Sequence, residues 1–284
     1  ESNEARQWAL DVTKHWIENI DIDGWRMDVA KELDFSFWKE FRDIAHKANK
    51  NTLLISEIFG DTSQWLQGDR FDGTMNYSFR EAMTDFFATK RINNKEFADS
   101  LAYLYSMYSF EALSSCQNLL SSHDVKRFLN RCGNDEDGIL GAIFLQATFP
   151  GIAGIYYGDE IGLGGADDPF NREPFPWHNK ESWNSTILEF TKKLMNIKKS
   201  NSIFKYGRFE LLDENEQFVA FRRILKDESM LCIINRSKSN DDFNIISNAH
   251  SVNVIHGDCK ANLDQGMIKV TDNSGNIGII LHEQ

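Results

Sequence analysis

The stretch "DGWRMDVAKEL", residues 23–33, places opposite charges inside a short apolar run. Charged side chains are costly within a sheet unless they are paired or used chemically. Successive side chains of a strand point to opposite faces, so Arg26 and Asp28 share one face. The other face carries the apolar side chains of Trp25, Met27 and Val29. One charged wall backed by one apolar wall predicts a supported site.

Strand-like and helix-like patterns alternate on both sides of this stretch. The run "TLLISEIF", residues 52–59, is continuously apolar before its acidic residue, which is typical of a strand covered on both faces. Five such alternations predict a parallel sheet with helical crossovers. We expect strands at 22–29, 52–59, 71–79, 118–124 and 151–160, and helices at 3–19, around 37–45, and at 80–88, 96–109, 140–147 and 187–199.

The pattern changes at about Ile203. Short strands with turn signals follow one another without helices, which predicts a separate antiparallel sandwich. We therefore expect a partial barrel at residues 1–202 and a β-sandwich domain at 203–284. The predicted strands lie within 209–225, 229–237, 250–257, 267–272 and 275–283.

Composition excludes several classes of partner. The 284 residues carry a formal net charge of −12, and no basic run is longer than a pair such as Lys198–Lys199. Nucleic acid and anionic membrane surfaces are therefore not expected as partners, and no run is long enough to span a membrane. The 4 cysteines show no CxxC spacing, which favours a reduced, cytoplasmic setting. The chain opens at Glu1 directly into a helical pattern, so we expect an internal start.

Acidic side chains lie at the ends of three of the predicted strands, at Asp28, Glu57 and Asp124. Carboxyl ends of parallel strands meet at one edge of the sheet, so we expect these acids in one pocket. Carboxylates that close together separate their pKa values, leaving one protonated and another ionised. Arg26 is placed to hold the ionised one, and His123 to donate to a substrate hydroxyl. Retaining glycoside hydrolysis needs such a pair of carboxyls.

Two other interpretations fit the same residues. An Arg–Asp pair in a strand can be a structural ion pair. Asp28, Glu57, His123 and Asp124 are also ordinary metal ligands. The residues by themselves leave the reaction class open.

Four segments together resemble the α-amylase family of glycoside hydrolases. "DGWRMDVAKE", "ISEIFG", "LLSSHDVKR" and "GIYYGDEIGLGG" occur in order and resemble segments at the fourth, fifth, seventh and eighth strands of a TIM (β/α)8 barrel. Finer features are similar to the branch of cyclomaltodextrinases, neopullulanases and maltogenic amylases. These features are "FDGTMNYSFREAMTDFF", "DDPFNREPFPW" and the pair Lys31–Glu32.

The resemblance implies a role for each matching residue. Asp28 is expected to be the nucleophile, Glu57 the general acid/base and Asp124 the stabiliser of the transition state. Arg26 is expected to keep Asp28 ionised, and His123 to hold the sugar at the cleavage site. The same resemblance places Lys31, Glu32 and Phe59 on the leaving-group side, and Asp168 and Arg172 of D-P-x-x-R on the other side. Phe59 stands where this branch often has Trp, and Lys31 where it often has Asn.

The implied activity is hydrolysis in carbohydrate metabolism, with transglycosylation as a second outcome. The expected substrates are α-1,4-glucans, maltooligosaccharides or cyclodextrins. No cofactor or metal is required for this catalysis; the acidic loop 133–138 has oxygen ligands that suit a structural calcium ion, although a solvated loop is favoured. Alternatives are a glucosyltransferase or isomerase of the same family, and a non-catalytic binding subunit. The branch also implies a homodimer in the full-length enzyme.

The resemblance covers only part of such an enzyme. The five predicted strands correspond to strands four to eight, and the third-strand segment D-x-x-x-N-H, the second-strand tyrosine and the inserted domain are absent. We therefore predict an incomplete barrel with open strand edges, which is inactive as an isolated chain.

Overall fold

Five short parallel strands form the first part of the protein, in a computed structural model that describes residues 2–212, 216–238 and 242–284. Parallel pairing joins the first three in the order β1-β2-β3 and the last two as β4-β5. A parallel bridge between Met75 and Gln117 links the two groups into one arc. The predicted α/β class and the five strands are confirmed. The strands are β1 (Gly24–Met27), β2 (Leu53–Ser56), β3 (Gly73–Thr74), β4 (Gln117–Leu119) and β5 (Ile152–Gly154).

The arc does not close. Within the described residues, β1 pairs only with β2 and β5 pairs only with β4. Residues from the inner wall, including Gly24, Ile55, Gln117 and Ile152, line an open hollow of about 320 Å³. The prediction of an incomplete barrel is therefore confirmed.

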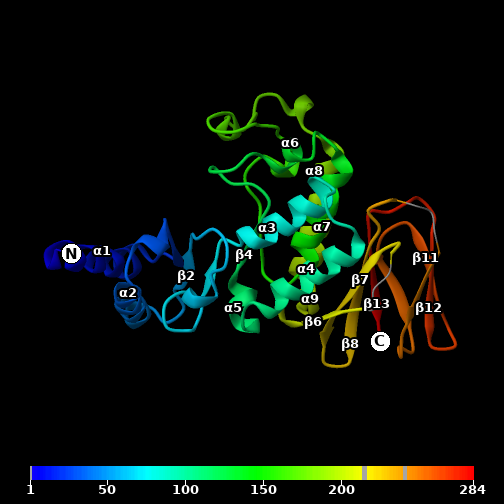
Figure 1. Cartoon of the computed structure of the whole chain (residues 1–284), viewed down its shortest axis with the longest axis horizontal. Coiled ribbons are helices and arrows are strands. Elements are labelled where there is room, and N and C mark those ends of the chain that lie inside the picture. The colour runs from blue at the N-terminus through cyan, green and yellow to red at the C-terminus, as the bar shows by residue number, and fades with distance from the viewer. Residues whose placement is uncertain (1, 213–215, 239–241) are drawn as a thin grey trace.

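Helices cover the outside of the arc. Helix α1 (Asn3–Ile20) is capped by Ser2, whose side chain accepts a hydrogen bond from the Ala5 amide, and it packs on α2 (Phe35–Ala48). Figure 1 shows these two helices at one end of the molecule and the C-terminal strands at the other. The remaining α-helices are α3 (Tyr77–Met83), α4 (Asn94–Ser106), α5 (Phe110–Ser115), α6 (Phe128–Arg131), α7 (Glu136–Thr148), α8 (Ser185–Ser200) and α9 (Ser202–Tyr206).

The predicted helices are present, with shifted ends. The helix expected at 80–88 begins earlier, at Tyr77, where the Asn76 side chain caps it, and continues as a π-turn over Thr84–Ala88. The three short helices α5, α6 and α9 were not predicted because each has too few turns for a periodic pattern. Within the described residues, no helix combines the length and the apolar character needed to cross a membrane.

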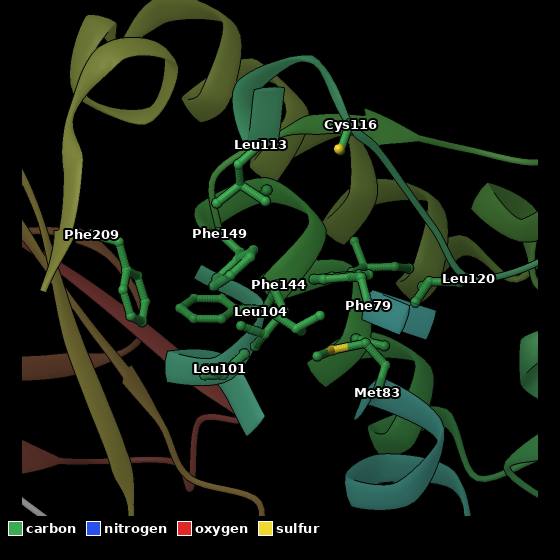
Figure 2. Close-up of a cluster of buried hydrophobic side chains, with 14 of the residues drawn as sticks. Phe79, Met83, Leu101, Leu104, Leu113, Cys116, Leu120, Phe144, Phe149 and Phe209 are labelled. Atoms are coloured by element: carbon green, nitrogen blue, oxygen red, sulfur yellow. The ribbon is translucent and has the colours of Figure 1, made fainter. Parts of the chain in front are cut away.

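A continuous core joins the barrel part to the C-terminal strands. Helix α7 is buried on all sides from Gly138 to Thr148, so it lies at the centre of this core. Figure 2 shows side chains from α3, α4 and α7 converging with Phe149 and with Phe209 of β6 (Arg208–Leu211). The rings of Phe149 and Phe209 lie 5.3 Å apart. The barrel part and the C-terminal strands therefore share a packed interface and are not joined by a linker alone.

The C-terminal strands form two antiparallel sheets, as the sandwich prediction requires. One sheet has the order β10-β13-β8-β7-β6 and the other β11-β12-β9. Their facing side chains form a second core that includes Leu231, Phe243 and Val270. Strands β9 and β11 were not predicted, because "DFNII" and "CKANLD" are short and rich in polar residues. The strands not yet given are β7 (Val219–Leu225), β8 (Glu228–Ile234), β9 (Asp242–Ile246), β10 (Val252–His256), β11 (Cys259–Asp264), β12 (Met267–Asp272) and β13 (Gly278–Glu283).

Candidate active site

The end of β1 presents Arg26 and Asp28 on the inner face of the arc. The Arg26 guanidinium donates to Asp28 Oδ1 at 2.8 Å. On the outer face, Trp25 packs edge-on against Phe41 of α2, with ring centroids 6.4 Å apart. The predicted alternation is therefore present for Trp25 and Met27, but the prediction for Val29 was wrong: β1 ends at Met27, and Val29 lies beyond it with 45% of its surface exposed.

Val29 turns the chain sharply after Asp28. Its backbone is left-handed, with φ 44° and ψ 42°, a conformation that a β-branched residue rarely adopts. The turn sends Ala30 into the core, where it is fully buried. It also directs the Val29 amide toward Glu57 Oε2, 3.3 Å away. Strain of this kind is commonly found at functional sites.

Glu57 lies beside Asp28 because β1 and β2 pair in register. Met27 is opposite Ser56, so the next residue of each strand continues the pairing. The Glu57 amide donates to the Met27 carbonyl at 2.9 Å, and the Arg26 guanidinium contacts the Glu57 carboxyl as well as that of Asp28. The two carboxyls differ in environment, since the Glu57 side chain is 6% exposed and that of Asp28 is 70% exposed.

The pKa values of the two carboxyls move in opposite directions. Burial, followed by the hydrogen bond that Glu57 shares with Asp28, raises the pKa of Glu57. The same hydrogen bond, followed by the Arg26 guanidinium, lowers the pKa of Asp28. Glu57 is therefore disposed to keep its proton and Asp28 to stay ionised, as general acid/base and nucleophilic chemistry require.

The third predicted acid, Asp124, lies in the turn that follows β4. His123 Nε2 is 3.1 Å from Asp124 Oδ2. Tyr77 connects this turn to the other acids: its hydroxyl is 3.2 Å from Ser122 Oγ. Burial raises the pKa of Tyr77, and the charges of Glu57 and Asp124 raise it further. Glu57 and Asp124 thus both lie near enough to Tyr77 to affect its pKa, so the turn with Asp124 lies on the same side of the arc as Asp28 and Glu57.

The other predicted site residues surround this region. Phe59 is half-exposed and stacks on Tyr77, with ring centroids 3.8 Å apart. Lys31 and Glu32 lie exposed in the short turn after β1. Arg172 Nε is 2.7 Å from Asp168 Oδ1, and its terminal nitrogen is 3.7 Å from Asp124 Oδ1. The contacts of these residues with a sugar stay predictions.

Sequence reasoning missed three residues of this region. Tyr77 and Ser122 link the acidic strand ends, and Asn171 lies behind the turn that carries Asp124. Tyr77 and Asn171 both lie in segments that resemble the family. Their hydrogen-bond partners, Ser122 and His123, are 45 and 48 residues away in the chain. Only the tertiary structure shows those partners.

The described residues contain no group of three or more His, Cys, Asp or Glu side chains arranged to hold a metal ion. In the acidic loop, Asp135 caps α7 by accepting from the Asp137 amide, and it pairs with Lys90 at 3.0 Å. Asp137 pairs with Lys238 at 3.0 Å.

Comparison with known proteins gives the family. Residues 1–206 match the family model described as alpha amylase, catalytic domain. The chain is 37% identical to a cyclomaltodextrinase of Thermoanaerobacter pseudethanolicus, over 84% of this chain and 41% of that protein. It is 39% identical to neopullulanase 2 of Thermoactinomyces vulgaris, over 83% and 40% respectively. The chain thus spans about two fifths of the length of these relatives.

Solved structures agree with this assignment. A debranching enzyme of Nostoc punctiforme superposes with a TM-score of 0.90 at 30% identity, covering 99% of this chain and 62% of that one. A cyclomaltodextrinase superposes with a TM-score of 0.89 at 26% identity, covering 100% and 49% respectively. The chain therefore belongs to the α-amylase family and corresponds to the C-terminal part of such enzymes.

Proposed function

We propose that this chain forms the catalytic part of a retaining hydrolase of α-glucosidic bonds. Its substrates would be α-1,4-glucans, maltooligosaccharides or cyclodextrins, with transglycosylation as a second fate of the intermediate. The observation that carries this proposal is the pairing of Glu57 with Asp28: one carboxyl with a raised pKa and one with a lowered pKa share the Arg26 guanidinium.

The reaction follows from this pair. Glu57 gives its proton to the glycosidic oxygen while the Asp28 carboxylate attacks the anomeric carbon, which forms a glycosyl ester and releases the leaving sugar. Glu57, now ionised, takes a proton from water, and the water cleaves the ester. Transglycosylation results when a sugar hydroxyl replaces that water.

A shared guanidinium favours the retaining stereochemistry. Retaining enzymes hold their carboxyls about 5 Å apart, whereas inverting enzymes leave room for a water molecule between theirs. Arg26 contacts both Asp28 and Glu57, and the two carboxyls share a hydrogen bond. A single guanidinium that bridges both carboxyls keeps them near one another, and this supports the retaining geometry.

Surrounding residues take supporting roles in this proposal. Asp124 stabilises the positive charge that develops on the sugar, and His123 donates to a hydroxyl of that sugar. Phe59, with Lys31 and Glu32, lines the leaving-group side, while Asp168 and Arg172 lie on the other side. No cofactor enters the reaction, and the paired aspartates of the loop 133–138 favour a solvated loop over a calcium site.

A cytoplasmic location is part of the same proposal. All four thiols are free, which suits the reducing cytoplasm, and one relative is an intracellular maltogenic amylase of Bacillus subtilis. The isolated chain is a separate matter. We further propose that the 284 residues alone are inactive, because strands from only part of the barrel surround the acids. Activity then belongs to the completed enzyme, meaning this chain together with the upstream barrel strands. A homodimer of that enzyme is implied by its branch of the family.

The test is the variant Asp28→Asn in the completed enzyme, assayed by the release of reducing ends from maltooligosaccharides. We expect turnover to fall by at least about a thousandfold, because the amide cannot form the ester. The matched control is Asp264→Asn, which removes an exposed aspartate paired with Lys269 at 2.6 Å in the C-terminal sheets. Undiminished turnover in Asp28→Asn would remove the nucleophile assignment.

Product analysis then distinguishes the family alternatives. Free reducing sugar indicates hydrolysis, and transferred or rearranged glucose indicates a glucosyltransferase or isomerase. Binding of maltooligosaccharide without any turnover of the wild-type enzyme would indicate a binding subunit. The same assay on the 284-residue chain tests whether this chain hydrolyses maltooligosaccharides without the upstream strands of the barrel.

A further inference from the structure

The turn that carries His123 and Asp124 is held by few bonds of its own. It follows β4 and reverses between Ser122 and Val125, whose backbones form an isolated bridge. The Val125 amide reaches the Ser122 carbonyl only at 3.5 Å, and the Asp124 amide donates to Ser122 Oγ at 3.1 Å. The orientation of the two side chains therefore depends on whatever binds the remaining carbonyls of the turn.

One buried side chain binds those carbonyls. Asn171 is fully buried, and its Nδ2 donates to the His123 carbonyl at 2.9 Å and the Val125 carbonyl at 3.1 Å, with a longer contact of 3.4 Å to that of Ser122. Three oxygens surround this atom, so it must be the nitrogen of the amide. Asn171 comes from the loop after β5, far from the turn in sequence.

The loop that holds Asn171 has one anchor outside the turn and one further bond to the turn itself. The Tyr156 hydroxyl donates to the Asn171 carbonyl at 3.3 Å. The neighbouring Arg172 donates from Nε to the His123 carbonyl at 2.9 Å. Tyr156 thus anchors the loop from outside the turn, and Asn171 and Arg172 both bond the loop to the turn.

We infer that Asn171 is a positioning residue, which orients the turn so that Asp124 and His123 face the reacting sugar. The inference rests on the proposed function, because it assigns those two residues to the reaction. Asn171 would not touch the substrate, since its side chain is buried behind the turn.

The hydrogen bonding of Asn171 indicates that this residue orients the turn rather than stabilises the folded state. Its Oδ1 is buried and has no hydrogen-bond partner among the described residues. A buried acceptor without a partner destabilises the folded state. An apolar side chain would avoid that cost but would leave the carbonyls of the turn without their shared donor. The donor function is therefore what the amide provides.

The test compares three variants of the completed enzyme. Asn171→Leu has nearly the same volume but no donor, and Asn171→Ser keeps a single donor. Asn235→Leu is the matched control: Asn235 is equally buried, accepts from the Ser237 hydroxyl at 2.9 Å, and lies in the C-terminal part. The readouts are kcat and KM for maltooligosaccharides, thermal unfolding, and backbone hydrogen exchange over residues 122–125.

We expect kcat of Asn171→Leu to fall about a hundredfold, because misplacing a group that acts on the transition state has an effect of that order. KM should change by less than about threefold, since uniform binding is untouched. Asn171→Ser should lie between, and exchange over 122–125 should rise at least about tenfold in Asn171→Leu. Asn235→Leu should lower the unfolding temperature while leaving kcat and that exchange unchanged.

Two results would overturn the inference. One is a kcat of Asn171→Leu within about threefold of wild type. The other is unchanged exchange over 122–125, which can be measured on this chain whether or not it is active. A wild-type enzyme that leaves α-glucans intact would instead refute the proposed function, and the exchange measurement would still decide whether Asn171 holds the turn.

Discussion

Arg26 is the residue whose removal tests the electrostatics of the site most directly. Its guanidinium contacts both Asp28 and Glu57, and a positive charge favours the ionised form of each carboxyl. The substitution Arg26→Met keeps most of the unbranched stem and removes the charge. We expect the pKa values of both carboxyls to rise. The pH profile of kcat/KM should then move to higher pH on both limbs, because Asp28 must be ionised and Glu57 protonated.

The size of the shift follows from the geometry. Unit charges about 4 Å apart attract by about 4 kcal/mol at an effective dielectric constant of about 20. The Arg26 side chain is 35% exposed and that of Glu57 is 6% exposed, so water screens part of this attraction. Halving it leaves about 2 kcal/mol, which corresponds to about 1.5 pKa units. The basic limb, which reports the protonated Glu57, should move by about that amount.

The assay is kcat/KM for a maltooligosaccharide between about pH 4 and pH 9 in the completed enzyme. The matched control is Arg42→Met, because Arg42 forms an ion pair with Asp72 at 2.7 Å and is 18% exposed. That control should leave both limbs in place. A profile of Arg26→Met that stays where the wild type has it, or that moves to lower pH, would refute the electrostatic reasoning.

Three further predictions concern the acid, the core and metal ions. Glu57→Gln should lower kcat on maltooligosaccharides by about 10²–10⁴ but spare the ester-forming step with a glycosyl fluoride, whose leaving group needs no proton; an equal loss in that step on both substrates would contradict the acid role. Phe144→Ala should lower the free energy of unfolding, measured with urea, by about 3–5 kcal/mol, because Phe144 is fully buried and its ring lies against Gly278; a loss below about 1 kcal/mol would show that the core collapses around the change. EDTA should leave activity and the unfolding temperature unchanged, and a loss restored by calcium would contradict a solvated loop 133–138 if the variant Asp135→Asn abolished that rescue.

The sequence by itself determined the features that repeat locally. Period-two alternation placed Arg26 and Asp28 on one face, and in the structure the two side chains pair at the end of β1. The succession of apolar runs and helical patterns predicted five parallel strands, and the order of the motifs predicted a barrel that does not close. Such patterns can be read because neighbours along a strand or a helix turn face the same surroundings. Strands β9 and β11 escaped this reading, because their polar residues obscure the alternation.

Only the tertiary structure decided how the acids differ from one another. The sequence offers Asp28 and Glu57 as two similar strand-end carboxylates, but the fold leaves one exposed and buries the other. Burial and the hydrogen bond between them raise the pKa of Glu57, and both depend on atoms brought together from distant parts of the chain. The same holds for Asn171, whose partners lie 46 to 49 residues away. Periodicity is a property of neighbours in sequence, whereas desolvation and hydrogen bonding across the fold are properties of neighbours in space.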